Sequence, residues 1–167
     1  MELPDAARDL LRALAWGMGR GLPGRGLPGR RLPGQGVWEA AATALSPNGV
    51  EYRAADLDWV LEHYGCHIIE DEQDGEAIYR LSHRTFAEHL VASSPDVAGR
   101  TAHQALAEAL VAFTETQTRD GDAQELCSPY LRRHLPRHAT HAGPDGVAAL
   151  RRLAVADPEF YLPGLAA

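Results

Sequence analysis

The residues best placed for chemistry in this chain are His83 and Arg84, which lie between a predicted strand and a predicted helix. Ser82 precedes them and is predicted to be the N-cap of the helix, its hydroxyl accepting a backbone N–H of the first turn. The free N–H groups and the dipole at such a helix start favour an anion. The dipole also disfavours imidazolium, so His83 can offer a neutral N–H to a phosphate oxygen. The spacing predicts a phosphate-sensing corner.

The elements that must hold this corner are short. Tyr79 and Leu81 alternate with His83 along an extended segment, and Phe86 and Leu90 then repeat at helical spacing. The simpler alternative is that His83 caps and packs at this strand–helix junction without binding a ligand.

A second group of candidate ligands is a histidine triplet. His134, His138 and His141 stand at i, i+4 and i+7 of one predicted helix, a spacing that can present imidazoles to Zn. No Glu lies between them as a general base, and Pro136 disturbs the helical register. We therefore interpret them as helix-surface and core-edge histidines and predict no metal site.

Catalysis finds little support in the sequence. Ser82 and His83 are neighbours, which rarely gives the geometry of a triad, and the side chains of Cys66 and His67 would point to opposite faces of a strand. All 16 basic residues are Arg, so the chain cannot supply the Lys of a P-loop. We predict a protein that is not an enzyme and has no cofactor of its own.

Length and composition limit the number of domains and the cellular location that the chain can have. The 167 residues allow one compact domain or two small ones, and an apolar content of 45% suffices for a core. No run of about 18 apolar residues suggests a membrane span, and the first residues lack a signal sequence. Cys66 and Cys127 lie far apart without a Cys-x-x-Cys pairing, as expected of reduced thiols. The expected location is cytoplasmic.

The order of predicted elements indicates a winged helix. An amphipathic helix that begins near Ala7 is followed by a Gly/Pro/Arg-rich segment, 21–36, in which Leu-Pro-Gly recurs three times and which is expected to be a disordered insertion. Predicted helices at 37–45 and 56–64 precede two extended segments joined by an Asp74-Gly75 turn. We predict a mainly α fold with a small β-hairpin: a winged-helix domain, 1–83, and a small helical bundle, 84–167. One shared core is expected to hold Trp16, Trp38 and Trp59.

Two segments carry a family resemblance. Residues 79–90, Tyr-Arg-Leu-Ser-His-Arg-Thr-Phe-Ala-Glu-His-Leu, resemble the Met-His-Asp region of winged-helix domains in signal-transducing NTPases with numerous domains, the NACHT and NB-ARC type found in actinobacteria. Residues 130–139, Tyr-Leu-Arg-Arg-His-Leu-Pro-Arg-His-Ala, are similar to the helix that follows this domain and precedes sensor repeats. The resemblance implies that His83 contacts the β-phosphate of bound ADP. Arg84 stands where the family usually has Asp.

The resemblance also implies a function and partners. The chain would be a non-catalytic regulatory module that latches a P-loop NTPase domain, in cis or in trans, and senses ADP or ATP only through that domain. A repeat sensor domain would lie downstream.

The rival hypothesis is a free-standing winged-helix transcriptional regulator. The predicted recognition helix carries Asp56, Asp58 and Glu62 and no Arg, and the predicted wing is also acidic. Phosphate contacts dominate nucleic-acid affinity, so we do not expect this chain to bind DNA.

Overall fold

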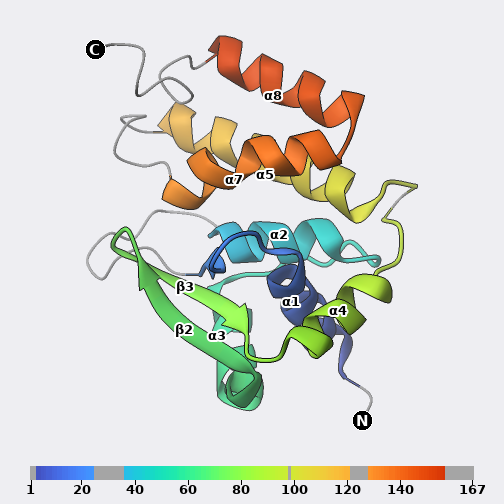
Figure 1. Ribbon diagram of the computed structural model, residues 1–167, viewed down its shortest axis with the longest axis vertical. Coiled ribbons are helices and arrows are strands. Elements are labelled where there is room, and N and C mark those ends of the chain that lie inside the picture. The colour runs from blue at the N-terminus through green and yellow to red at the C-terminus, as the bar shows by residue number, and fades with distance from the viewer. Residues whose placement is uncertain (1–2, 25–35, 98, 121–127, 157–167) are drawn as a thin grey trace. The chain divides into compact units, whose positions relative to one another are not determined.

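The computed structural model describes residues 3–24, 36–97, 99–120 and 128–156 (Figure 1). It confirms the predicted fold class, mainly helical with a small antiparallel sheet. The chain forms two compact units, an N-terminal unit, Met1–Gly99, and a helical unit, Arg100–Ala167. The division therefore falls after Gly99, not after residue 83 as predicted.

The N-terminal unit has the element order of a winged helix. Its sheet is antiparallel with strand order β1-β3-β2, and Ile68 of β2 faces Leu81 of β3. The elements are α1 (Asp5–Trp16), β1 (Leu22–Pro23), α2 (Val37–Leu45), α3 (Ala54–Tyr64), the 3-10 turn η1 (Gly65–His67), β2 (Ile68–Gln73), β3 (Glu76–Leu81) and α4 (Arg84–Ala92).

Strand β1 lies inside the segment that the sequence predicts to be a disordered insertion. Leu22 pairs with Tyr79 of β3 and its side chain is buried. The Gly24 N–H donates to the Ala77 carbonyl, 3.3 Å away. The repeat was thus wrongly assigned at its start, because burial of Leu22 and pairing with β3 outweigh the local cost of Gly and Pro. Residues 25–35 of the predicted insertion lie outside the described residues.

Gly21 makes this pairing possible. Its φ is +145°, and a Cβ there would lie 2.5 Å from the Tyr79 carbonyl oxygen. We expect Gly21→Ala to destabilise the N-terminal unit by about 2 kcal/mol or more. Gly65 is the matched control, because no atom lies within 4 Å of a Cβ built there, and Gly65→Ala should change stability by less than about 1 kcal/mol. Urea unfolding followed by tryptophan fluorescence compares the two, and equal effects would contradict the argument.

The core of the N-terminal unit is built around α1, which packs against α2, α3, α4 and β3. Trp38 of α2 is fully buried, and its indole N–H donates to the Leu10 carbonyl, 2.9 Å away. Trp59 is 36% exposed and Trp16 is half-buried, so the prediction of one shared tryptophan core is wrong. The apolar stripe of α3 passes through Leu57 and Val60 and leaves Trp59 on its edge.

Helix α4 belongs to the N-terminal unit, which explains why the division falls later than predicted. Leu90 is buried, and α4 lies beside α1 (Figure 1). The Trp16 indole N–H donates to Ser94 Oγ, 2.9 Å away, and this bond ties the end of α1 to the residues after α4.

The helical unit consists, in its described residues, of three helices that pack on one another. The Ser128 hydroxyl caps the second of them and accepts the backbone N–H of Tyr130. Its bounds are α5 (Ala102–Asp120), α7 (Pro129–His141) and α8 (Pro144–Ala156). The large buried side chains are Leu106, Leu110, Leu131, Leu135 and Leu153.

Candidate functional site

His83 lies between the end of strand β3 and the start of α4. The Ser82 backbone N–H donates to the His67 carbonyl, 2.8 Å away, which extends the β2–β3 pairing by one residue. His83 follows in an extended conformation, with φ −118° and ψ 121°, and α4 begins at the next residue. The His83 side chain is exposed, as a ligand contact requires.

His83, and not Ser82, is the N-cap of α4. The His83 carbonyl accepts the Ala87 N–H, and within the described part of the chain no side chain caps the helix start. Ser82 Oγ is buried and, within the described residues, makes no hydrogen bond. The prediction of a Ser82 cap is wrong because Ser82 is still held by the strand pairing with His67. Among the residues that the structure describes, the N–H groups of the first turn therefore have no side-chain partner, and such a helix start favours an anion.

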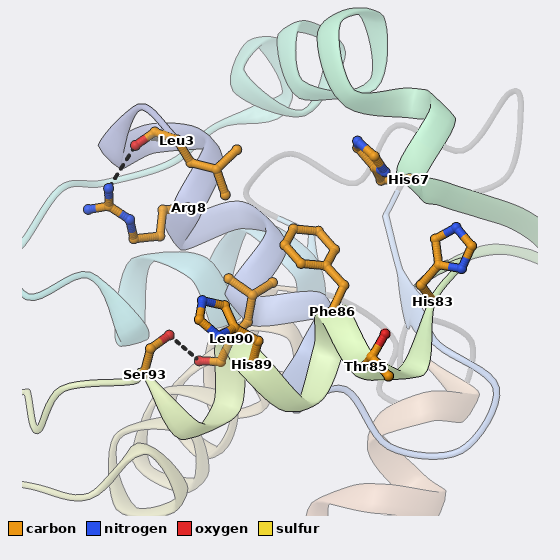
Figure 2. A pocket seen from close by; sticks show the side chains of 9 residues that line it. All are labelled: Leu3, Arg8, His67, His83, Thr85, Phe86, His89, Leu90 and Ser93. Atoms are coloured by element: carbon orange, nitrogen blue, oxygen red, sulfur yellow. Dashed lines mark hydrogen bonds between the residues drawn. The ribbon is translucent and has the colours of Figure 1, made fainter. Parts of the chain in front are cut away.

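A pocket of about 610 Å³ opens along α4, and His83 lies at its edge (Figure 2). His67 stands beside His83 at one end of this α4 pocket, Phe86 lies between the ends, and His89 and Ser93 lie at the other end. The ring of His67 contacts the ring of Phe86, with centroids 5.8 Å apart. The full lining is Leu3, Arg8, His67, His83, Thr85, Phe86, His89, Leu90 and Ser93.

The lining of the α4 pocket combines apolar side chains with basic or neutral polar groups. It contains three histidines, one arginine and no carboxylate. The Arg8 guanidinium is already engaged, because it donates to Asp5 Oδ1 at 2.9 Å and to the Leu3 carbonyl at 2.8 Å. The imidazoles near the helix start are therefore the groups that can meet an anion.

Arg84 does not line this pocket. Its side chain is 91% exposed, and its Nε donates to Glu88 Oε1 one turn further along α4, 2.7 Å away. The two residues singled out by the sequence thus separate: His83 faces the pocket, while Arg84 forms an exposed ion pair.

The histidine triplet lies in the helical unit, on α7. His134 and His138 are buried, and His141 is exposed and stacks on His103 of α5 with centroids 4.8 Å apart. Burial and the neighbouring cations lower the pKa of His134, and burial and His103 lower that of His138 to about 4. Among the residues that the structure describes, no group of three His, Cys, Asp or Glu side chains could hold a metal ion.

The surfaces that a winged helix turns toward DNA are acidic here. Asp58 and Glu62 are exposed on α3, and Glu70, Glu72 and Asp74 are exposed on the hairpin. Asp56 is at the third position of α3, where its carboxylate accepts the Arg53 backbone N–H at 2.8 Å.

Sequence reasoning missed the partners of His83 in the α4 pocket. His67 is brought beside His83 by the hairpin register, Arg8 comes from the first turn of α1, and Leu3 precedes that helix. The pairing of residues 68 and 81 could have indicated His67, since the next pair outward brings residues 67 and 82 together. No signal in the sequence links Arg8 to this pocket.

The described residues therefore form a unit of helices and a small antiparallel sheet, with an exposed imidazole between β3 and α4, and a second, helical unit. None of the helices within these residues has the length and apolar character needed to cross a membrane. Comparisons with protein-family models, with curated proteins and with solved structures found no match.

Proposed function

We propose that this chain is a non-catalytic regulatory module of a signal-transducing NTPase, which contacts the phosphate of a nucleotide held by a partner P-loop domain. The observation that carries the proposal is the position of His83: exposed, at an N-terminus without a side-chain cap, and at the edge of the α4 pocket. A neutral imidazole and free backbone N–H groups suit a phosphate oxygen. The resemblance of residues 79–90 to the Met-His-Asp region supports the same role.

The nucleotide has to come from the partner. The chain contains no Lys, so it cannot build the P-loop that binds β- and γ-phosphates. One imidazole at a helix start gives weak, solvent-competed binding by itself. In our proposal, ADP in the partner favours the latched arrangement and exchange for ATP releases it, a shift between two populations in the cytoplasm. A repeat sensor domain downstream would bias the same equilibrium.

Protein recognition is favoured over DNA binding by the charges on α3 and the hairpin. Their exposed carboxylates would repel a phosphate backbone. The regulator hypothesis would require salt-dependent binding to random duplex DNA, which we expect to be absent at low salt.

The test first looks for a P-loop NTPase domain encoded beside this chain in the genome, and then mixes that domain with the chain, with and without ADP. Binding measured by calorimetry should be tighter with ADP, and His83→Ala should weaken this ADP-dependent part about tenfold, the effect of one lost hydrogen bond to a charged group. His89→Ala is the matched control, because His89 is an exposed histidine of the same helix at the other end of the pocket. An unchanged ADP effect in His83→Ala, or the absence of any adjoining P-loop domain, would overturn the proposal.

A further inference from the structure

Helix α3 presents an aromatic side chain to solvent on the surface that other winged helices use for recognition. Trp59 is 36% exposed, whereas Leu57 and Val60 on the inner side of the helix are buried. Trp59 differs in this respect from Trp38 and Tyr52 of the same unit, which are fully buried. Tryptophan is also the residue most enriched among the side chains that dominate binding energy in interfaces.

The Trp59 ring is flanked on α3 by two other rings. His63, one turn later, stacks on it with centroids 4.9 Å apart and an interplanar angle of 27°, and Tyr64 contacts it at 5.9 Å. The His63 Nδ1–H donates to the Trp59 carbonyl, 2.8 Å away, which fixes the orientation of the imidazole. These three rings, which we call the aromatic platform of α3, are therefore held in place before a partner binds, and this lowers the entropic cost of binding.

Carboxylates border this platform. Asp58 and Glu62 are exposed and are four residues apart, and Glu62 follows Trp59 by three, so all three share one side of the helix. Residues 54–64 contain no Arg or Lys. We call the surface formed by Asp58, Trp59, Glu62 and His63 the α3 face.

We propose that the α3 face binds an arginine-bearing segment of a protein partner. A guanidinium is planar, so it can stack on the Trp59 ring while its N–H groups meet the carboxylate of Asp58 or Glu62. An ammonium on lysine lacks this planar fork and should bind less well. The inference does not depend on the nucleotide contact of His83, since no residue of the α3 face lines the α4 pocket.

The test uses the full chain and a fluorescein-labelled pentapeptide, Gly-Arg-Gly-Arg-Gly, with lysine and citrulline versions of the same peptide. Anisotropy should show binding of the arginine peptide, binding about fivefold weaker for lysine, and none for the neutral citrulline peptide. The NMR signal of the Trp59 indole N–H, assigned by its loss in Trp59→Phe, should shift during the arginine titration.

Two double variants separate the α3 face from net charge. Asp58→Asn with Glu62→Gln removes two carboxylates from α3, and Glu70→Gln with Glu72→Gln removes two exposed carboxylates from the hairpin. The α3 variant and Trp59→Ala should each weaken arginine-peptide binding about fivefold or more, and the hairpin variant less than twofold.

Three outcomes would overturn the proposal. Equal losses in the two double variants would mean that the peptide senses only net charge. Equal affinity for arginine and lysine peptides, with no shift of the Trp59 signal, would exclude stacking. Self-association of the chain in sedimentation, abolished by Trp59→Ala, would assign the α3 face to a second copy instead.

Discussion

Replacing Asp9 by alanine is expected to destabilise the N-terminal unit by about 3–5 kcal/mol, the usual effect of removing one partner from a buried ion pair. Asp9 Oδ1 accepts from Arg12 Nη1 at 2.8 Å, and both side chains are at least 95% buried. Asp9 Oδ2 accepts from the Tyr52 hydroxyl at 3.0 Å. Burial and the Asp9 carboxylate raise the pKa of Tyr52, so its hydroxyl remains a donor. The variant would leave a guanidinium buried without its counter-charge.

Asp5 provides the matched control for this prediction. It forms the same kind of i, i+3 pair with Arg8 at 2.9 Å on α1, but its side chain is 73% exposed. Asp5→Ala should therefore cost no more than about 1 kcal/mol. Urea unfolding followed by tryptophan fluorescence reports the N-terminal unit, because all three tryptophans lie in it. A similar loss in both variants would show that the Asp9 network contributes no more than a surface pair.

The helical unit should lose stability as the pH falls from about 6.5 to about 4. His138 is 1% exposed, and its Nε2 shares a 2.9 Å hydrogen bond with the Tyr130 hydroxyl. Burial lowers its pKa from 6.5 to about 4, and the charged groups that act on it, His103, His134, His141 and Arg137, are all cationic when ionised.

The sign of the effect follows from the lowered pKa. Above pH 6.5 neither the folded nor the unfolded state binds the His138 proton, so the stabilisation is complete. Below it the unfolded state binds the proton first, and about 3 kcal/mol is lost by the time the pH reaches the folded-state pKa. The pKa values of His103 and His134 are also lowered, mainly by burial, and add in the same direction.

Hydrogen exchange read by mass spectrometry can follow α7 peptides separately from α1 peptides, so each unit is measured by itself. His138→Gln should flatten the pH dependence of exchange in α7 and leave that of α1 unchanged. His89→Gln, at an exposed histidine of the N-terminal unit, should leave the α7 dependence intact. A His138 ring that titrates near pH 6.5 by NMR would contradict the prediction.

Most of the fold could be predicted from local patterns. The apolar stripes of α1 and α3 and the Asp74-Gly75 turn identify the elements, and their order indicates the winged helix. Strand β1 could not be found this way, because two residues carry no periodicity and the surrounding glycines and prolines suggest disorder. It exists because Leu22 has a place in the core and β3 offers a free edge.

Only the part of the candidate site that depends on residues close together in the sequence was predicted. His83 was placed at the strand–helix corner by residues within ten positions of it. Arg84 and Ser82 were given roles that depend on side-chain direction, which spacing alone does not fix. Arg84 pairs with Glu88, and the hydroxyl oxygen of Ser82 is buried. The residues around His83 come from distant parts of the chain, so they could not be predicted from the sequence near it. The exposure of Trp59 likewise depends on tertiary packing, which a short sequence segment does not reveal.

The packing of α4 against α1 limits how the segment around His83 could be grafted onto another protein. Because the helix that starts after His83 rests on the first helix of the chain, with Trp16 tied to Ser94, the hairpin and α4 are not a portable motif. A graft limited to residues 68–92 would carry the imidazole but not the support beneath it. The smallest segment that keeps the geometry begins with α1.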